Sequence, residues 1–134
     1  MALLEWVKAN QGKAIDRDGS YGAQCVDLVE AYLADFLRVP TWPGNAIDFA
    51  GQRHAGWTWV ANSPSNFPVP GDVVVWGGPN AEVGTSAFGH CAIALAASPN
   101  TLLVLSQNWP PGSATQLRLM DYRAVLGWQH RHSG

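Results

Sequence analysis

The first half of the chain carries apolar residues at the three- and four-residue intervals of amphipathic helices. This spacing predicts a short helix over residues 2–10 and a longer one over residues 25–39. In the longer segment, the apolar residues that share one face are Leu28, Val29, Tyr32, Leu33 and Phe36. Pro40 ends this helix, because proline lacks a backbone N–H group and clashes with the preceding turn. A third, short helix is expected over residues 45–52.

The second half of the chain is rich in short apolar runs that are bounded by Gly, Pro or Asn and are typical of β-strands. The segments that contain them are WTWVANSPSNFPVPG, GDVVVWGG, GHCAIALAAS, TLLVLSQNW, TQLRLMDY and VLGWQHRHS. Because helices come first and strands follow, we expect an α+β fold and not alternating βαβ units. In this fold the N-terminal helices pack on a C-terminal antiparallel β-sheet. No internal repeat or long linker divides the chain, so a single domain over residues 1–134 is expected.

Composition and charge exclude several classes of partner. The 134 residues include 8 Lys and Arg against 10 Asp and Glu, which is too little positive charge to hold nucleic acid by its phosphates. No stretch approaches the roughly 18–20 apolar residues that a membrane span requires, so membrane insertion is not expected. The start of the chain, MALLEWVKANQGK, has Glu5 and Lys8 among its apolar residues and does not resemble a signal peptide. We expect a monomer.

The two cysteines have different surroundings. Cys25 opens the predicted helix, where unpaired backbone N–H groups and the positive end of the helix dipole stabilise a thiolate. Cys91 lies in the apolar run GHCAIALAA and is expected to be buried. Two free thiols are expected in a chain without a secretion signal, and a Cys25–Cys91 disulfide is the alternative. Cys25 is therefore the candidate nucleophile. The alternative is a chemically inert thiol.

A cysteine nucleophile needs a base, and His90 is the candidate. It stands at the first position of an apolar strand, after Gly89, which allows another segment to approach closely. On the next strand, alternation places Ser106 and Asn108 on one face and Gln107 on the other. Asn108 is therefore a candidate to orient His90. The alternatives are a structural histidine and an asparagine that only ends a strand.

The loop before Cys25 has a pattern of oxygen ligands. Asp16, Asp18 and the backbone over residues 20–22 can curl around one point, and Gly19 permits the sharp turn. Asp27, one turn into the helix, can return as a further ligand. All of these groups offer oxygen, which favours calcium over zinc. The loop lacks the glutamate that closes an EF-hand loop, and a turn without metal is the alternative.

Five segments occur in the order seen in CHAP domains; they are DRDGSYGAQCVDL, GNAIDFA, VPGDVVVW, FGHCAIAL and LSQNW. The chain thus resembles the cysteine, histidine-dependent amidohydrolases/peptidases that are common in bacteriophage endolysins and bacterial cell-wall hydrolases. The resemblance implies a papain-like α+β fold and cleavage of peptidoglycan amide bonds, with Cys25 as nucleophile and His90 as base. It also implies a structural or activating Ca²⁺, held by the carboxylates of Asp16, Asp18 and Asp27 and the carbonyls of Ser20 and Gly22.

The resemblance implies a peptidoglycan hydrolase, either an endopeptidase or an N-acetylmuramoyl-L-alanine amidase, that works through a cysteine thioester. Such a phage lysin is made in the host cytoplasm without a signal peptide and acts on the bacterial cell wall, so bacterial peptidoglycan is the expected partner. The backbone N–H of Cys25 and the side chain of Gln24 are expected to stabilise the oxyanion.

One position departs from the family pattern. Many members carry Glu where this chain has Ser106, and a serine supplies no carboxylate. Asn108 must therefore orient His90 alone, or another group must help. The alternative function is a non-catalytic wall-binding or virion structural module that retains the fold. The retained set of Cys25, His90 and Asn108 argues against that alternative.

Overall fold

The helices precede the sheet, as the apolar spacing predicts. The computed structural model describes residues 2–19 and 22–132. Its helices are α1 (Leu3–Asn10), α2 (Cys25–Ala31), the π-helical η1 (Tyr32–Leu37) and the 3-10 helix η2 (Ala46–Phe49). None of the helices in the described ranges is long and apolar enough to cross a membrane.

The helix expected over residues 25–39 begins at Cys25 but changes character midway. It is α-helical as far as Ala31, and η1 then continues it with wider, π-helical turns. It ends at Arg38, which has a left-handed backbone with φ of 59°. Pro40 follows, as expected for a residue that cannot continue a helix.

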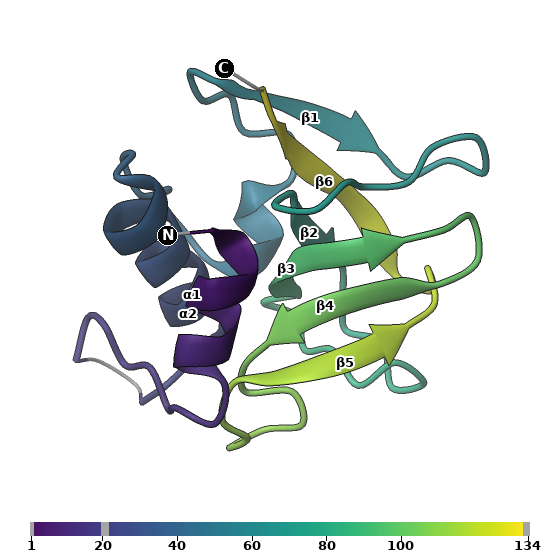
Figure 1. Ribbon diagram of the computed structural model, residues 1–134. Coiled ribbons are helices and arrows are strands. Elements are labelled where there is room, and N and C mark those ends of the chain that lie inside the picture. Colours follow the sequence, from purple (N-terminus) through teal and green to yellow (C-terminus); the bar gives the residue numbers. More distant parts are fainter. Residues whose placement is uncertain (1, 20–21, 133–134) are drawn as a thin grey trace.

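Six strands form one sheet in the order β1-β6-β2-β3-β4-β5. They are β1 (Trp57–Ala61), β2 (Val73–Trp76), β3 (His90–Ala97), β4 (Leu102–Ser106), β5 (Gln116–Met120) and β6 (Val125–Arg131). All neighbouring strands are antiparallel, and each expected strand segment supplies one of them. Figure 1 shows the helices gathered on one face of this sheet. The α+β prediction is confirmed.

Two apolar clusters cover the two faces of the central strands. Leu28 of α2 and Leu33 of η1 are fully buried with Val75 of β2 and Ile93 of β3. Burial of each such side chain contributes roughly 1.5–3 kcal/mol to the free energy of folding. Strand alternation directs the intervening residues to the opposite face, where the second cluster includes Val74, Ala92 and Trp128. This packing fixes α2 across β3.

The position of β3 depends on the glycine before it. Gly89 has φ of 72°, and a Cβ atom there would lie 2.5 Å from the carbonyl oxygen of Trp76. A side chain at this position would meet backbone at a distance that real Cβ atoms do not reach, so only glycine fits. The close approach expected at Gly89 is confirmed. It places His90, the first residue of β3, against the start of α2, which is Cys25.

Candidate active site

A cavity of about 550 Å³ opens at the start of α2. The residues that line it are Gln24, Cys25, Val26, Asn45, Ala46, Ser86, Phe88, Gly89 and Asn108. The half-buried Cys25 is the first residue of the helix, and the Asp27 carboxylate accepts a hydrogen bond of 2.9 Å from Gln24 N. The expected nucleophile and the expected oxyanion-binding residue therefore share one cavity.

The thiol of Cys25 lies against two residues of β3. Its interactions with Cys91 and His90 together hold the pKa of Cys25 well below its ordinary value. Cys91 makes the larger contribution, His90 adds a hydrogen bond and a favourable charge, and burial opposes both. Burial raises the pKa of Cys91 well above its ordinary value, so Cys91 keeps its proton and donates it. The arrangement favours the thiolate at Cys25.

Both cysteines are free, and their exposures differ as expected from their surroundings. Cys91 is fully buried in the cluster between α2 and the sheet, whereas Cys25 reaches the cavity. The alternative of a Cys25–Cys91 disulfide is therefore not realised in the structure.

The partner of His90 is the serine at the end of β4. His90 Nε2 and Ser106 Oγ are 2.8 Å apart, and both side chains are buried. Because Ser106 occupies Nε2, Nδ1 is the ring nitrogen left for an interaction with Cys25, whose pKa His90 lowers. A neutral imidazole with its proton on Nε2 would then present a lone pair to the thiol.

Two tryptophans enclose the His90 ring. The centroid of the Trp109 ring lies 4.2 Å from that of His90, and the centroid of the Trp76 ring lies 5.5 Å from it. Both tryptophans are buried, and their rings also pack edge to face. This enclosure restricts the orientations of the imidazole and keeps water from its sides.

Asn108 does not lie where strand alternation places it. Strand β4 ends at Ser106, and Asn108 has a left-handed backbone with φ of 62°. The expected shared face of Ser106 and Asn108 is therefore wrong, because alternation does not extend past the end of a strand. Asn108 Oδ1 accepts a hydrogen bond of 2.7 Å from Gly112 N. The residue still lines the cavity beside Cys25.

Gln107 has a structural role that the sequence does not reveal. Its amide Oε1 accepts from Ile15 N at 2.7 Å, and its Nε2 donates at 2.8 Å to the carbonyl oxygens of Ile15 and Gln24. The buried Gln107 amide thereby ties both ends of the acidic loop, Ile15 and Gln24, to the end of β4. Gln24 is the residue directly before Cys25. The one available signal is a polar residue directly after an apolar strand.

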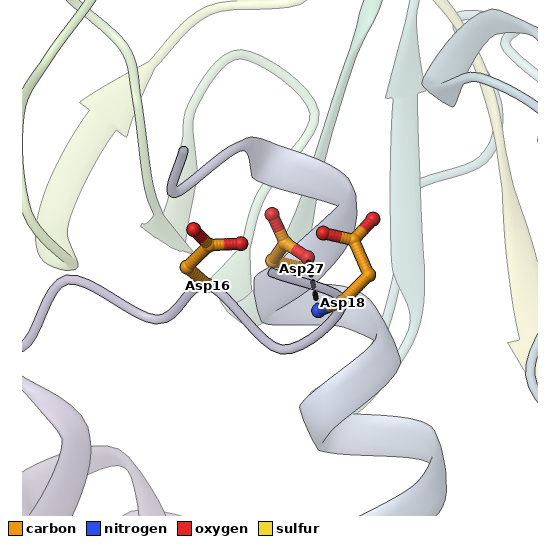
Figure 2. A group of neighbouring side chains, drawn as sticks. All are labelled: Asp16, Asp18 and Asp27. Carbon is orange, nitrogen blue, oxygen red and sulfur yellow. Dashed lines mark hydrogen bonds between the residues drawn. The ribbon is translucent and has the colours of Figure 1, made fainter. Parts of the chain in front are cut away.

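Three carboxylates gather where this loop meets α2. Oxygens of Asp16, Asp18 and Asp27 lie within 4.8 Å of one another, and Figure 2 shows the two loop residues on either side of Asp27. Asp18 N donates a hydrogen bond of 3.4 Å to Asp27 Oδ1. Burial raises the pKa of Asp27, and the charges of Asp18 and Asp16 raise it further. This cost of gathering like charges is what a bound cation removes, so the cluster fits a hard divalent ion.

The structure does not test the two carbonyl ligands, of Ser20 and Gly22, that are expected for the same ion. Ser20 lies outside the described residues. Gly22 has φ of 76°, which glycine adopts readily, in the turn that leads from the acidic loop to α2. The structure therefore brings together the three expected carboxylates, and the two carbonyls stay a prediction.

The segment of the chain that contains these site residues matches a known protein family. The profile of the CHAP domain family matches residues 15–108. The chain belongs to the CHAP domain family. The matched range of the CHAP domain begins just before Asp16 and ends at Asn108, so it contains every candidate site residue.

Two phage endolysins are similar to this CHAP domain in sequence. Endolysin PlyTW of Staphylococcus phage Twort is 34% identical over 111 residues, which cover 78% of the chain. Endolysin LysK of Staphylococcus phage K is 36% identical over 100 residues, which cover 72% of the chain. The matched region is 23% of PlyTW and 19% of LysK, so the chain corresponds to a minor part of each.

Two solved structures share the fold of this CHAP domain. The crystal structure of endolysin LysIME-EF1 superposes with a TM-score of 0.83 at 28% identity, over 98% of this chain and 63% of that one. The structure of Ly7917 with the hydrolyzing product of MDP gives a TM-score of 0.71 at 18% identity, over 96% of this chain and 61% of that one. The papain-like CHAP fold expected from the resemblance is confirmed.

Proposed function

We propose that this CHAP domain hydrolyses an amide bond of bacterial peptidoglycan, as a single catalytic unit over residues 1–134. The observation that carries the proposal is a chain of three side chains: Cys25, which lines the cavity, and the buried His90 and Ser106 behind it. A thiol with a lowered pKa, a base in contact with it and a partner for that base are the parts of a cysteine nucleophile. Membership of the CHAP family and the similarity to phage endolysins support peptidoglycan as the substrate.

The reaction begins when His90 takes the proton of the Cys25 thiol, and the resulting thiolate attacks the amide carbonyl carbon. The backbone N–H of Cys25, at the unpaired start of α2, and the Gln24 side chain in the cavity wall stabilise the oxyanion. His90 gives a proton to the leaving nitrogen, and the carbon–nitrogen bond breaks to leave a thioester and a free amine. Water then attacks the thioester while His90 takes its proton, and the carbon–sulfur bond breaks to restore the thiolate.

Ser106 holds the histidine for both proton transfers. Its hydroxyl occupies His90 Nε2, so rotation of the ring away from Cys25 costs a buried hydrogen bond. The hydroxyl is neutral, and it therefore orients the imidazole without the charge that a glutamate would add. Asn108, whose side chain accepts from Gly112 N, contributes to the cavity wall in this scheme.

The acidic loop is proposed to hold Ca²⁺ through Asp16, Asp18 and Asp27, with carbonyls of Ser20 and Gly22. When bound, the ion supplies positive charge that offsets the repulsion among the carboxylates. The loop is coupled to the cavity through this chain's own contacts. Asp27 accepts from Gln24 N, so order in the loop is transmitted to the residue before Cys25.

Digestion of purified cell walls tests the function. Wild-type protein and Cys25→Ala would be compared by loss of turbidity on walls from a panel of bacteria, with mass analysis of the soluble fragments. We expect fragments only from the wild type, and their masses distinguish an endopeptidase from an N-acetylmuramoyl-L-alanine amidase. Walls that bind both proteins and lose no turbidity with either would favour the non-catalytic wall-binding module.

A further inference from the structure

One large apolar side chain stands exposed at the cavity that holds Cys25. Phe88 is 65% exposed, although it lies two residues before the buried His90 and lines the same cavity as Cys25. An exposed phenylalanine forgoes the burial that such a ring ordinarily gains. The mechanism above assigns it no task.

The backbone on both sides of Phe88 is held in place. Phe88 O accepts a hydrogen bond of 2.9 Å from Ile47 N of η2, and Phe88 N donates one of 3.2 Å to Ser86 Oγ. The next residue, Gly89, lies where a Cβ atom would approach Trp76 O to 2.5 Å. These contacts fix the backbone from which the ring projects, so little ordering is needed when a ligand packs against it.

The chemistry of the cavity indicates what the ring meets. Apart from the nucleophile Cys25, none of the nine described residues that line it has an ionisable side chain. Val26, Ala46 and Phe88 provide its apolar surface, and the polar side chains include the amides of Gln24 and Asn45. Such a lining offers hydrogen bonds to peptide groups and contact to aliphatic side chains, and it offers no ion pair to a carboxylate or an ammonium group.

We propose that Phe88 is a substrate-binding residue, whose ring packs against an uncharged aliphatic residue of the wall peptide beside the scissile amide. The inference rests on the proposed function and adds the chemical character of the residue bound there. Because the contact forms on binding and persists in the transition state, its loss raises KM and leaves kcat nearly unchanged.

The test compares Phe88→Ala, Phe88→Leu and the control Leu119→Ala on peptidoglycan made soluble by cleavage of its glycan strands. Leu119 is also exposed, at 71%, but lies on the edge strand β5 and not in the cavity wall. We expect KM to rise roughly tenfold for Phe88→Ala and less for Phe88→Leu, with kcat within about twofold of wild type and Leu119→Ala unchanged. An unchanged KM in Phe88→Ala, or a fall in kcat alone, would overturn the proposal.

Binding separates this proposal from the proposed function. In the Cys25→Ala background, affinity for the same soluble fragments would be measured with and without Phe88→Ala. Weaker binding of the double variant supports the role of Phe88 even if wild-type protein cleaves nothing. Equal binding contradicts that role even if wild-type protein cleaves the wall.

Discussion

His90 Nε2 lies 2.8 Å from Ser106 Oγ, and the two buried side chains connect the start of β3 with the end of β4. The contact gives the imidazole a fixed partner on the side away from Cys25. A hydroxyl thus stands where many CHAP domains have a carboxylate, and it makes the hydrogen bond that an orienting group has to make. Serine in place of glutamate at position 106 therefore removes a negative charge beside His90 but keeps the hydrogen bond to the imidazole.

Loss of the Ser106 hydroxyl is predicted to slow catalysis more than it weakens the fold. Ser106→Ala leaves a buried ring nitrogen of His90 without its partner, so kcat should fall roughly 10- to 100-fold. Ser113→Ala is the control, because its Oγ atom has no hydrogen-bond partner among the described residues. Turnover of soluble wall fragments measures the effect, and kcat equal to wild type in Ser106→Ala would show that His90 is oriented by another group.

The two thiols are predicted to react at very different rates. Cys25 borders the cavity and has a lowered pKa, whereas Cys91 is fully buried and has a raised one. Iodoacetamide should therefore alkylate Cys25 in the folded protein and Cys91 only after unfolding in urea. Peptide mapping by mass spectrometry assigns the modified residue. Modification of Cys91 first, or a single disulfide in place of two thiols, contradicts the arrangement.

Calcium is predicted to raise stability and activity together. A free concentration about 100 times Kd should add about 2.7 kcal/mol to the free energy of unfolding, which raises Tm by several degrees. Chelation should reverse the gain, and Asp18→Asn should remove most of the response. Asp121→Asn is the control, since Asp121 pairs with Arg123 away from the acidic loop. Melting curves and lysis rates that are the same in chelator and in calcium would contradict a calcium site.

Gln107 is predicted to stabilise the loop that leads to Cys25. Gln107→Ala removes the partner of Ile15 N and of two carbonyl oxygens, so the free energy of unfolding should fall by about 1–3 kcal/mol. Gln116→Ala is the matched control, because the Gln116 amide has one described hydrogen bond, to Trp109 O. Urea denaturation measures both. Equal losses in the two variants would show that the three bonds of Gln107 add nothing.

The parts of the site that local chemistry determines were predictable from the sequence. Cys25 is recognisable because a helix begins there, and His90 because a glycine precedes it at the start of an apolar strand. Asp16 and Asp18 alternate at the spacing of an oxygen-rich loop, and Asp27 follows in the first turn of the next helix. Order along the chain also predicts helices packed on a sheet, since each element carries its own periodicity.

The parts that depend on distant contacts were not predictable. The partners of Gln107 are backbone atoms 83 and 92 residues away, and no local pattern reports them. The pairing of β1 with β6, which brings opposite ends of the sheet region together, is equally non-local. Asn108 was misplaced because alternation was extended two residues past Ser106, where β4 ends. The hydrogen bond of Ser106 depends on geometry that residue type alone does not convey.

Chemical analysis of the digested wall tests the central claim, that Cys25 cleaves an amide bond of peptidoglycan, most directly. Free amino groups and reducing sugar ends would be counted after incubation of one purified wall with wild type, Cys25→Ala and Cys91→Val. We predict new amino groups without new reducing ends for the wild type, background levels for Cys25→Ala, and slower but retained cleavage for Cys91→Val, because His90 still lowers the pKa of Cys25. New reducing ends, or equal release of amino groups by Cys25→Ala, would contradict the claim.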